Sequence, residues 1–106
     1  MKAHALHPEA DQEYAEAAQH YASISPELGG RFYDAIERLI AEACERPRLY
    51  RQIRPPVRRH FTAEFPYGIL YAERPDEIWI VAVMPLKRGP DYWLHRLGQG
   101  ATGNLP

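Results

Sequence analysis

The sequence predicts an α+β fold, in which an N-terminal helical hairpin packs on a small, mainly antiparallel sheet of three to five strands. Apolar residues recur with helical spacing over residues 8–46 and mainly with strand spacing over residues 57–83. Because the helices precede the strands instead of alternating with them, the pattern favours a sheet with both helices on one face. The chain of 106 residues is long enough for one domain only.

Two helices are expected in the first half of the chain. The first begins at Pro8, since proline is tolerated in the first turn of a helix. Ser25 caps a second helix that starts at Pro26 and ends before Pro47. The pair Gly29-Gly30 either weakens the first turn of this helix or lets the two helices approach closely. The apolar stripes are Ala10, Tyr14, Ala17, Ala18, Tyr21 and Ile24 in the first helix, and Leu28, Phe32, Ile36, Leu39, Ile40 and Ala43 in the second.

The second half of the chain has the two-residue period of strands. The expected elements are strands at 57–65, 69–72 and 78–83, shorter strands at 2–6 and 49–53, and a short C-terminal helical turn at 91–97. The stretch 78–83 is apolar on both faces, which places it in the interior of the sheet. We expect residues 1–97 to form the domain and the Gly-rich residues 98–106 to form a flexible tail.

Composition excludes several classes of protein. Cys44 is the only cysteine, so no internal disulfide forms, and its place in the second stripe predicts a buried core residue. No apolar run approaches the ~18 residues of a membrane span, and the N-terminus lacks the apolar core of a signal peptide. A cytoplasmic protein is therefore expected. The sequence has no phosphate-binding glycine loop, HExxH or CxxC motif, so no metal, cofactor or small-molecule substrate is expected, and His4 and His7 are interpreted as surface residues.

The formal net charge of −1 conceals an asymmetry between the two halves. Residues 1–46 carry four Lys or Arg and nine Asp or Glu, a net charge of −5, whereas residues 47–106 carry nine and five, a net charge of +4. The stretch 46–59 contains six arginines and no acidic residue. Such a block indicates an anionic partner, such as a phosphate, a nucleic acid or an acidic peptide. A solvated basic strand face that balances acidic helices is an equally good interpretation.

Basic and aromatic residues also gather on the predicted strands and after them. The set comprises Arg58, Arg59, Tyr67, Tyr71, Arg88, Tyr92, Trp93 and Arg96. A metal-free ribonuclease needs such groups, because cations stabilise the phosphorane and a base activates the 2′-hydroxyl. The structural alternative is stronger on residue types alone: the tyrosines and Trp79 form the core of the sheet, and Arg88 and Arg96 pair with Asp91 or with acids of the helices.

An ordered set of short motifs resembles the RelE/ParE-type toxins. The motifs are His7–Ala10, Glu13, Tyr21, Phe32–Tyr33, Pro47, Val57–Arg59, Phe65–Tyr67, Ile69, Tyr71, Ile80–Val83 and Arg88–Trp93. The resemblance covers about residues 3–97 and implies a helical hairpin on a small antiparallel sheet. It also implies the toxin of a type II toxin–antitoxin module, silenced by a cognate antitoxin that folds over its surface.

The resemblance implies two different mechanisms. RelE-like members cut mRNA in the ribosome, whereas ParE-like members act on DNA gyrase and need no nuclease site. If the chain is a ribonuclease, the resemblance implies Arg59, Arg88 and Tyr92 as catalytic residues. Phe61 and Gly68, however, stand where nuclease members carry basic residues, and Pro85 stands where many relatives carry histidine. Because each lost cation costs roughly 10²-fold in rate or more, the ParE-like mechanism is favoured, and a non-toxic relative that only binds an antitoxin is the third alternative.

Partner binding is predicted mainly for the basic half of the chain. The candidate residues are Arg51, Arg54, Arg58, Arg59, Arg88, Trp93 and Arg96. The exposed rim of the helical hairpin is the alternative docking surface. Since Arg58 and Arg59 alternate along one strand, they must point to opposite faces of the sheet.

Overall fold

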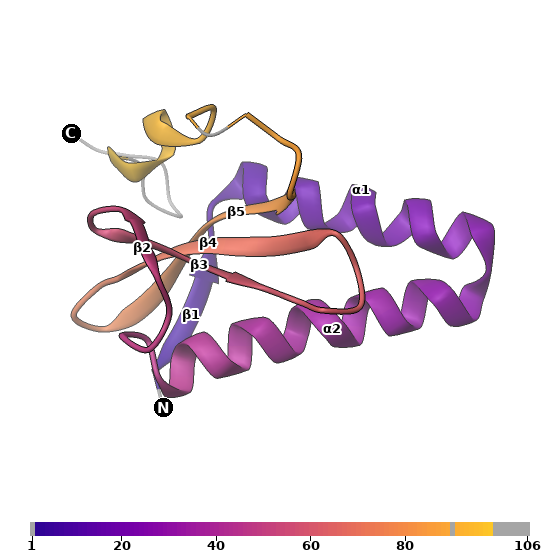
Figure 1. The fold of residues 1–106 in the computed structure, drawn as a ribbon, viewed down its shortest axis with the longest axis horizontal. Coiled ribbons are helices and arrows are strands. Elements are labelled where there is room, and N and C mark those ends of the chain that lie inside the picture. The colour runs from indigo at the N-terminus through magenta and orange to yellow at the C-terminus, as the bar shows by residue number, and fades with distance from the viewer. Residues whose placement is uncertain (1, 90, 99–106) are drawn as a thin grey trace.

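The computed structural model describes residues 2–89 and 91–98, and it has the predicted α+β architecture (Figure 1). Its elements in chain order are β1 (Ala3–Leu6), α1 (Pro8–Ile24), α2 (Pro26–Glu45), β2 (Gln52–Arg54), β3 (Val57–Phe61), β4 (Tyr67–Glu73), β5 (Glu77–Pro85) and the 3₁₀ turn η1 (Leu94–Gly98). The tail predicted at 98–106 lies outside the described residues from position 99 onward. No described helix is both long enough and apolar enough to cross a membrane.

The five strands form one sheet in the order β1-β5-β4-β3-β2. The edge strand β1 runs parallel to β5, and the other neighbours are antiparallel. Strand β5 therefore lies between β1 and β4, as its apolar character on both faces predicted. A parallel partner for β5 is available because the whole helical hairpin connects β1 to the rest of the sheet.

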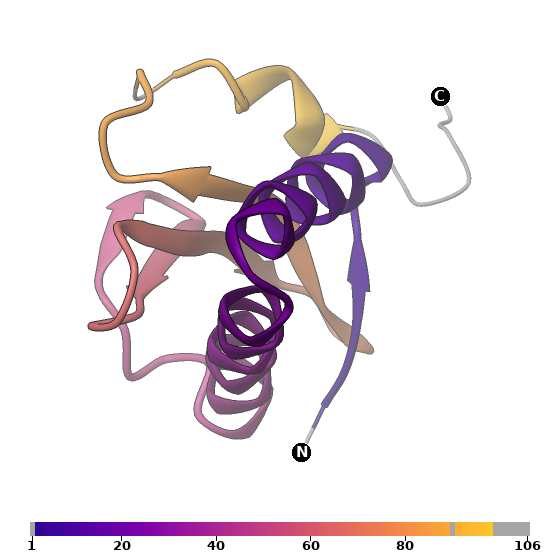
Figure 2. The same cartoon turned by 90° about the vertical axis from the view of Figure 1, so that its right-hand side faces the viewer.

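The helices pack side by side on one face of the sheet, with α1 against β5 and α2 against β4 (Figure 2). The predicted cap is confirmed, since the Ser25 hydroxyl accepts a hydrogen bond of 3.0 Å from the backbone N–H of Leu28. A Cβ atom at Gly29 would lie 2.6 Å from Cβ of Ala22. Gly29 is therefore buried at the crossing of the two helices, and close approach is the interpretation that holds.

Each face of the sheet carries its own apolar cluster. The helix-covered face includes Phe32, Ile36, Ile69 and Tyr71, while the opposite face is built around Trp79 and Trp93 with Leu70 and Met84. We call this second surface the open face, because no helix longer than the η1 turn lies on it. Cys44 is buried in the helix-side cluster, as predicted.

Several sequence-based expectations need correction. Ile24 is 62% exposed, because the tip of the hairpin extends beyond the sheet (Figure 1). Strand β3 ends at Phe61 instead of residue 65. His7 is buried instead of lying on the surface. Its Nδ1 atom accepts a hydrogen bond of 3.0 Å from the N–H of Glu9 and thereby caps α1, and its ring packs against Trp79.

Candidate functional site

The open face contains a hollow of about 200 Å³ between the ends of strands β2 to β5 and residues 91–98, which we call the C-terminal segment. We call it the sheet-face hollow. Its lining residues are Ile53, Arg59, Phe61, Leu70, Met84, Leu86, Arg88 and Trp93. Two residues expected from the sequence to share a site, Arg59 on β3 and Arg88 after β5, therefore meet here. All the charge on the lining residues is positive.

The alternation of β3 assigns its two arginines to different roles. Arg58 points to the helix side, where its guanidinium donates to the carbonyl of Tyr50 at 2.8 Å and fixes the loop before β2. On the same side the imidazole of His60 lies 2.7 Å from the carboxylate of Glu42. Arg59 points to the open face, with its guanidinium 5.0 Å from the centre of the Phe61 ring. Arg59 is thus the arginine of this pair that lines the hollow.

Phe61 and Gly68 depend on each other. They are directly paired across β3 and β4. The Phe61 ring fills the space over Gly68, so that any Cβ atom at position 68 would overlap it. An aromatic ring packed over a cross-strand glycine thus replaces the two basic residues that the resemblance to nucleases would require at these positions. Phe61 and Gly68 thus differ from the nuclease pattern together, and this part of the surface is apolar instead of charged.

Tyr92 lies beside the hollow under two guanidinium groups. The centre of its ring is 3.9 Å from the guanidinium carbon of Arg88 and 4.9 Å from that of Arg96. Burial raises the pKa of Tyr92 to about 12, and the charge of Glu13 acts in the same direction. The phenol is therefore neutral at pH 7 and is poorly suited to act as a general base.

Arg96 has a structural position. Its guanidinium donates to both carboxylate oxygens of Glu13 at 3.0 Å and to the carbonyl of Val81 at 3.1 Å. The Glu13 carboxylate also accepts a hydrogen bond of 3.1 Å from the backbone N–H of Val83. Since β1 pairs with β5 only as far as Ile80, these side chains satisfy the edge of β5 that no strand covers.

The partner-binding candidates therefore separate into buried and accessible residues. Trp93 and Arg96 are 1% and 3% exposed, which argues against a direct contact with a partner. Arg54 is exposed, and its guanidinium lies 3.2 Å from the carboxylate of Asp91. Arg51, three residues earlier in the chain, is also exposed. Arg96 pairs with Glu9 and Glu13 of α1, as the structural interpretation of its residue type predicted, whereas Arg88 forms no ion pair with a described acidic residue.

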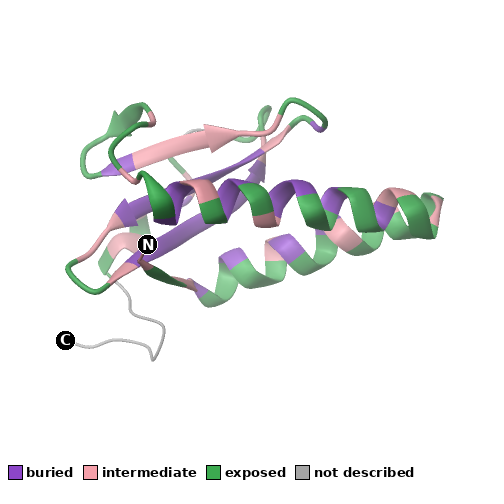
Figure 3. Cartoon of the chain, turned by 90° about the horizontal axis from the view of Figure 1, so that it is seen from below, coloured by how far each residue is buried: buried purple, intermediate pink, exposed green. Residues whose placement is uncertain are grey.

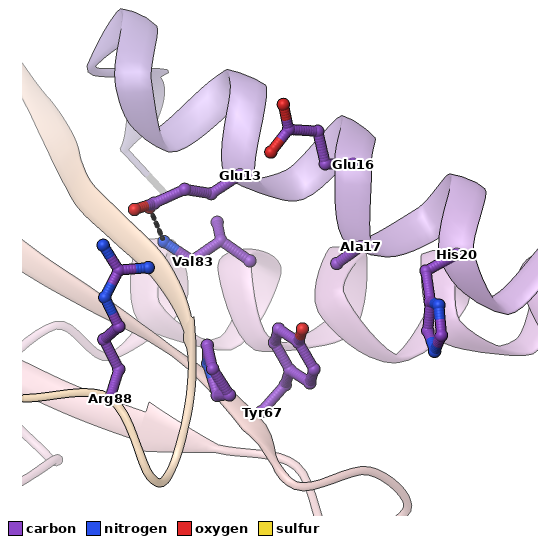
Figure 4. A pocket seen from close by; sticks show the side chains of 8 residues that line it. Glu13, Glu16, Ala17, His20, Tyr67, Val83 and Arg88 are labelled. Carbon is purple, nitrogen blue, oxygen red and sulfur yellow. Dashed lines mark hydrogen bonds between the residues drawn. The ribbon is translucent and has the colours of Figure 1, made fainter.

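A second, polar cleft of about 220 Å³ lies between α1 and the ends of β4 and β5 (Figure 4). Arg88 and Glu13 lie at one end of this cleft and His20 at the other, with Glu16 and Tyr67 between them. The Glu13 carboxylate is already engaged by Val83 and Arg96, and Arg88 is the one arginine or lysine among the residues that line the cleft. The sequence did not predict this cleft, because Glu16 and His20 stand outside the apolar stripe of the first helix. The available signal was the spacing of Glu13, Glu16 and His20, which follow one another at intervals of three and four residues and therefore lie along one side of the helix.

Comparison with known families now decides the assignment. A family model described as the ParE toxin of type II toxin–antitoxin system, parDE, matches residues 5–89. The chain belongs to the ParE toxin family. A search of curated proteins finds no match.

The ParE assignment covers most of the hollow but not its C-terminal border. Arg59, Phe61, Gly68 and Arg88 all lie within the matched range, whereas Trp93 lies beyond its end at residue 89. Membership in this family makes the chain the toxin of a type II module and implies a cognate antitoxin as its partner. Among residues 2–89 and 91–98 of this ParE-family toxin, no three His, Cys, Asp or Glu side chains are grouped as metal ligands.

Proposed function

We propose that this ParE-family toxin acts in the cytoplasm by binding a protein target, DNA gyrase, and that its cognate antitoxin neutralises it. The observation that carries this proposal is the packing of Phe61 over Gly68 on the open face. The packing leaves no room for a long basic side chain at position 68. A surface of this kind favours contacts with a protein over contacts with a scissile phosphate.

The electrostatics of the hollow support the same proposal. Cleavage of RNA by attack of a 2′-hydroxyl on the adjacent phosphate, with departure of the 5′-oxygen, needs several cations around the phosphorane and a group that accepts a proton near pH 7. The hollow supplies Arg59 and Arg88, while Tyr92, with its pKa raised by burial to about 12, remains protonated. At roughly 10²-fold for each missing group, such a site would be a very slow nuclease.

A ribosome-dependent, metal-free endoribonuclease is the second candidate. It is favoured by the juxtaposition of Arg59 and Arg88 in one hollow and by the close contact of Arg88 with Tyr92. These are the three residues of this chain that the resemblance to nucleases implies as catalytic. On this hypothesis Arg88→Ala abolishes mRNA cleavage, whereas in a gyrase-directed toxin it leaves RNA intact because no cleavage occurs in either form.

The deciding experiment is induction of the protein without antitoxin, followed by pulse labelling of DNA and protein synthesis. An early fall in DNA synthesis, together with inhibition of supercoiling by purified gyrase, is the expected result. Arg31→Gln is the matched control for the Arg88 variant, because it also removes one arginine, and Arg31 pairs with Glu64 and does not line the hollow. An early fall in protein synthesis with cleaved mRNA would establish the nuclease instead. Harmless expression would refute both activities and leave a non-toxic relative.

A further inference from the structure

We infer that the sheet-face hollow binds an acidic protein segment, which inserts one large apolar side chain and places a carboxylate beside it. This inference rests on the proposed function, because an antitoxin is the partner that would carry the segment. It adds where on the fold the segment binds and which side chains of the segment, one apolar and one acidic, would anchor it. Three independent features of the hollow support it.

The first feature is the apolar lining of the hollow, part of which is exposed to solvent. Leu70, Met84 and Trp93 are buried at its base, whereas Ile53 and Leu86 are 38% and 46% exposed. A cavity of about 150 Å³ admits a benzene molecule, so a hollow of about 200 Å³ has room for the side chain of a leucine or a phenylalanine. Covering Ile53 and Leu86 would remove apolar surface from water and favour association.

The second feature is unmatched hydrogen-bond donors. Neither Arg59 nor Arg88 forms an ion pair with an acidic residue in the part of the chain that the structure describes. The indole N–H of Trp93, which lines the same hollow, is buried and has no acceptor among these residues. An unsatisfied buried donor costs about 1–3 kcal/mol. A carboxylate offers several acceptor sites and complements the two guanidinium groups at the mouth of the hollow, while the buried Trp93 beneath them serves as a reporter of binding.

The third feature is that neither aromatic residue among the described lining, Phe61 or Trp93, offers an open face for stacking. Single-stranded nucleic acids bind where aromatic rings lie open to the bases. Trp93 is 1% exposed, and the Phe61 ring lies against Gly68 on one strand and under Arg59 on the other side. An acidic peptide is therefore favoured over RNA, even though both are anionic. The net charge of +4 on residues 47–106 would steer either of them toward this half.

The test titrates the ¹⁵N-labelled full chain with three capped pentapeptides and follows the two tryptophan indole N–H signals by NMR. The probes are Glu-Asp-Leu-Asp-Glu, the same peptide with Gly in place of Leu, and Lys-Lys-Leu-Lys-Lys. Trp79 is the internal control, because its indole N–H is also buried with no acceptor within residues 2–89 and 91–98 but lies outside the hollow. We expect the acidic leucine peptide to shift the Trp93 signal saturably and to leave the Trp79 signal in place. The glycine peptide is expected to bind at least about 5-fold more weakly, which corresponds to about 1 kcal/mol.

Variants locate the binding site. Arg88→Gln and Leu86→Ala are each expected to weaken the leucine peptide by about 5-fold or more, while Arg31→Gln leaves its affinity unchanged. An unshifted Trp79 signal in each variant verifies that the sheet is intact. Equal binding of the leucine and glycine peptides, tighter binding of the lysine peptide or of a single-stranded RNA octamer, or no response of Trp93 at millimolar peptide would each overturn the inference.

The outcome is separable from that of the proposed function. If the peptide shifts Trp93 but gyrase is unaffected by the protein, the gyrase target is wrong and the anchor site stands. If gyrase is inhibited and Trp93 does not respond to the peptide, the anchor site is wrong and the gyrase target stands.

Discussion

The two faces of the sheet differ in how completely their polar groups are satisfied. On the helix-covered face, the Tyr14 hydroxyl donates to the Glu37 carboxylate at 2.8 Å and the Tyr71 hydroxyl donates to the carbonyl of Pro47 at 2.6 Å. On the open face, the indole N–H groups of Trp79 and Trp93 have no acceptor among the described residues. Figure 3 shows the buried stripe of the hairpin turned toward the strands, with exposed residues on its outer side.

This difference indicates a division of labour between stability and binding. Buried donors that lack acceptors are uncommon in folded proteins, and each requires an explanation. The helix-covered face is completed by the chain itself. On the open face, Arg59 and Arg88 form no ion pair with a described acidic residue, and exposed apolar side chains surround a hollow. A partner that completes the open face would explain both features. The following predictions test this contrast, from the largest effect to the smallest.

Phe32→Ala tests the helix-covered face. Phe32 is fully buried and packs edge-on against Phe65 and Tyr67. Its removal is expected to lower the free energy of unfolding by about 3–5 kcal/mol, as measured by urea denaturation. The matched change on the open face, Leu86→Ala, is expected to cost less than about 1 kcal/mol because this side chain is 46% exposed. Equal losses would contradict the division between the two faces.

Arg96→Met tests the link between the C-terminal segment and the rest of the fold. The substitution leaves Glu13 without its guanidinium partner, at an expected cost of about 2–3 kcal/mol. Glu13→Gln combined with Arg96→Met is expected to restore part of the loss, because the half-buried carboxylate at position 13 is then neutral and only the exposed Glu9 has lost its partner. Arg54→Gln is the control, since its exposed pair with Asp91 contributes at most about 1 kcal/mol. A loss for Arg96→Met no larger than for this control would show that the C-terminal segment is not held by the pair.

Gly68→Ala tests the coupling of Phe61 and Gly68. The added methyl group overlaps the Phe61 ring, so we expect a loss of about 1–3 kcal/mol in the free energy of unfolding. Phe61→Ala in the same chain opens the space, and the two losses are therefore expected to be non-additive by about 1 kcal/mol. Strict additivity in the double-mutant cycle would mean that the two positions are independent and would weaken the argument against a nuclease.

Alkaline pH is expected to have the most gradual effect. Burial raises the pKa of Tyr71 and of Tyr92 to about 12 and that of Tyr14 further. The folded state thus favours the protonated phenols, and the stability that they contribute is fully present below about pH 10 and is lost as the pH rises toward 12. Absorbance at 295 nm and circular dichroism measured together should show late tyrosine ionisation that coincides with unfolding. Complete ionisation near pH 10 with the fold intact would contradict the burial of these side chains.

Local signals in the sequence predicted much of the fold. Pro8, Ser25, Pro26 and Pro47 fix the helix ends through short-range geometry, so both helices were predicted nearly to the residue. The end of β3 at Phe61 was missed, because the alternation of polar and apolar residues continues to position 65 although pairing with β4 stops earlier. Ile24 was misassigned for a similar reason. Its helical spacing is correct, but no strand extends beneath it.

The candidate site was predicted less completely. The family resemblance predicted that Arg59 and Arg88 lie near one site. The apolar hollow that both residues line was not predicted. Arg96 and Trp93 were grouped with the binding residues, yet both are buried where the C-terminal segment packs on the rest of the fold. Side-chain burial depends on contacts between distant parts of the chain, and no local pattern near residue 96 points to Glu13.

The sequence by itself determined the two helices, the existence of the strands, the opposite charges of the two halves and the ParE-type family pattern. All of these depend on periodicity, capping residues and residue type, which act over a few neighbouring positions. The tertiary structure alone decided which arginines are accessible, that Phe61 occupies the space above Gly68, and that Glu13 and Arg96 satisfy the uncovered edge of β5. These features arise from pairs of residues that are far apart along the chain, so only the folded arrangement brings their atoms together.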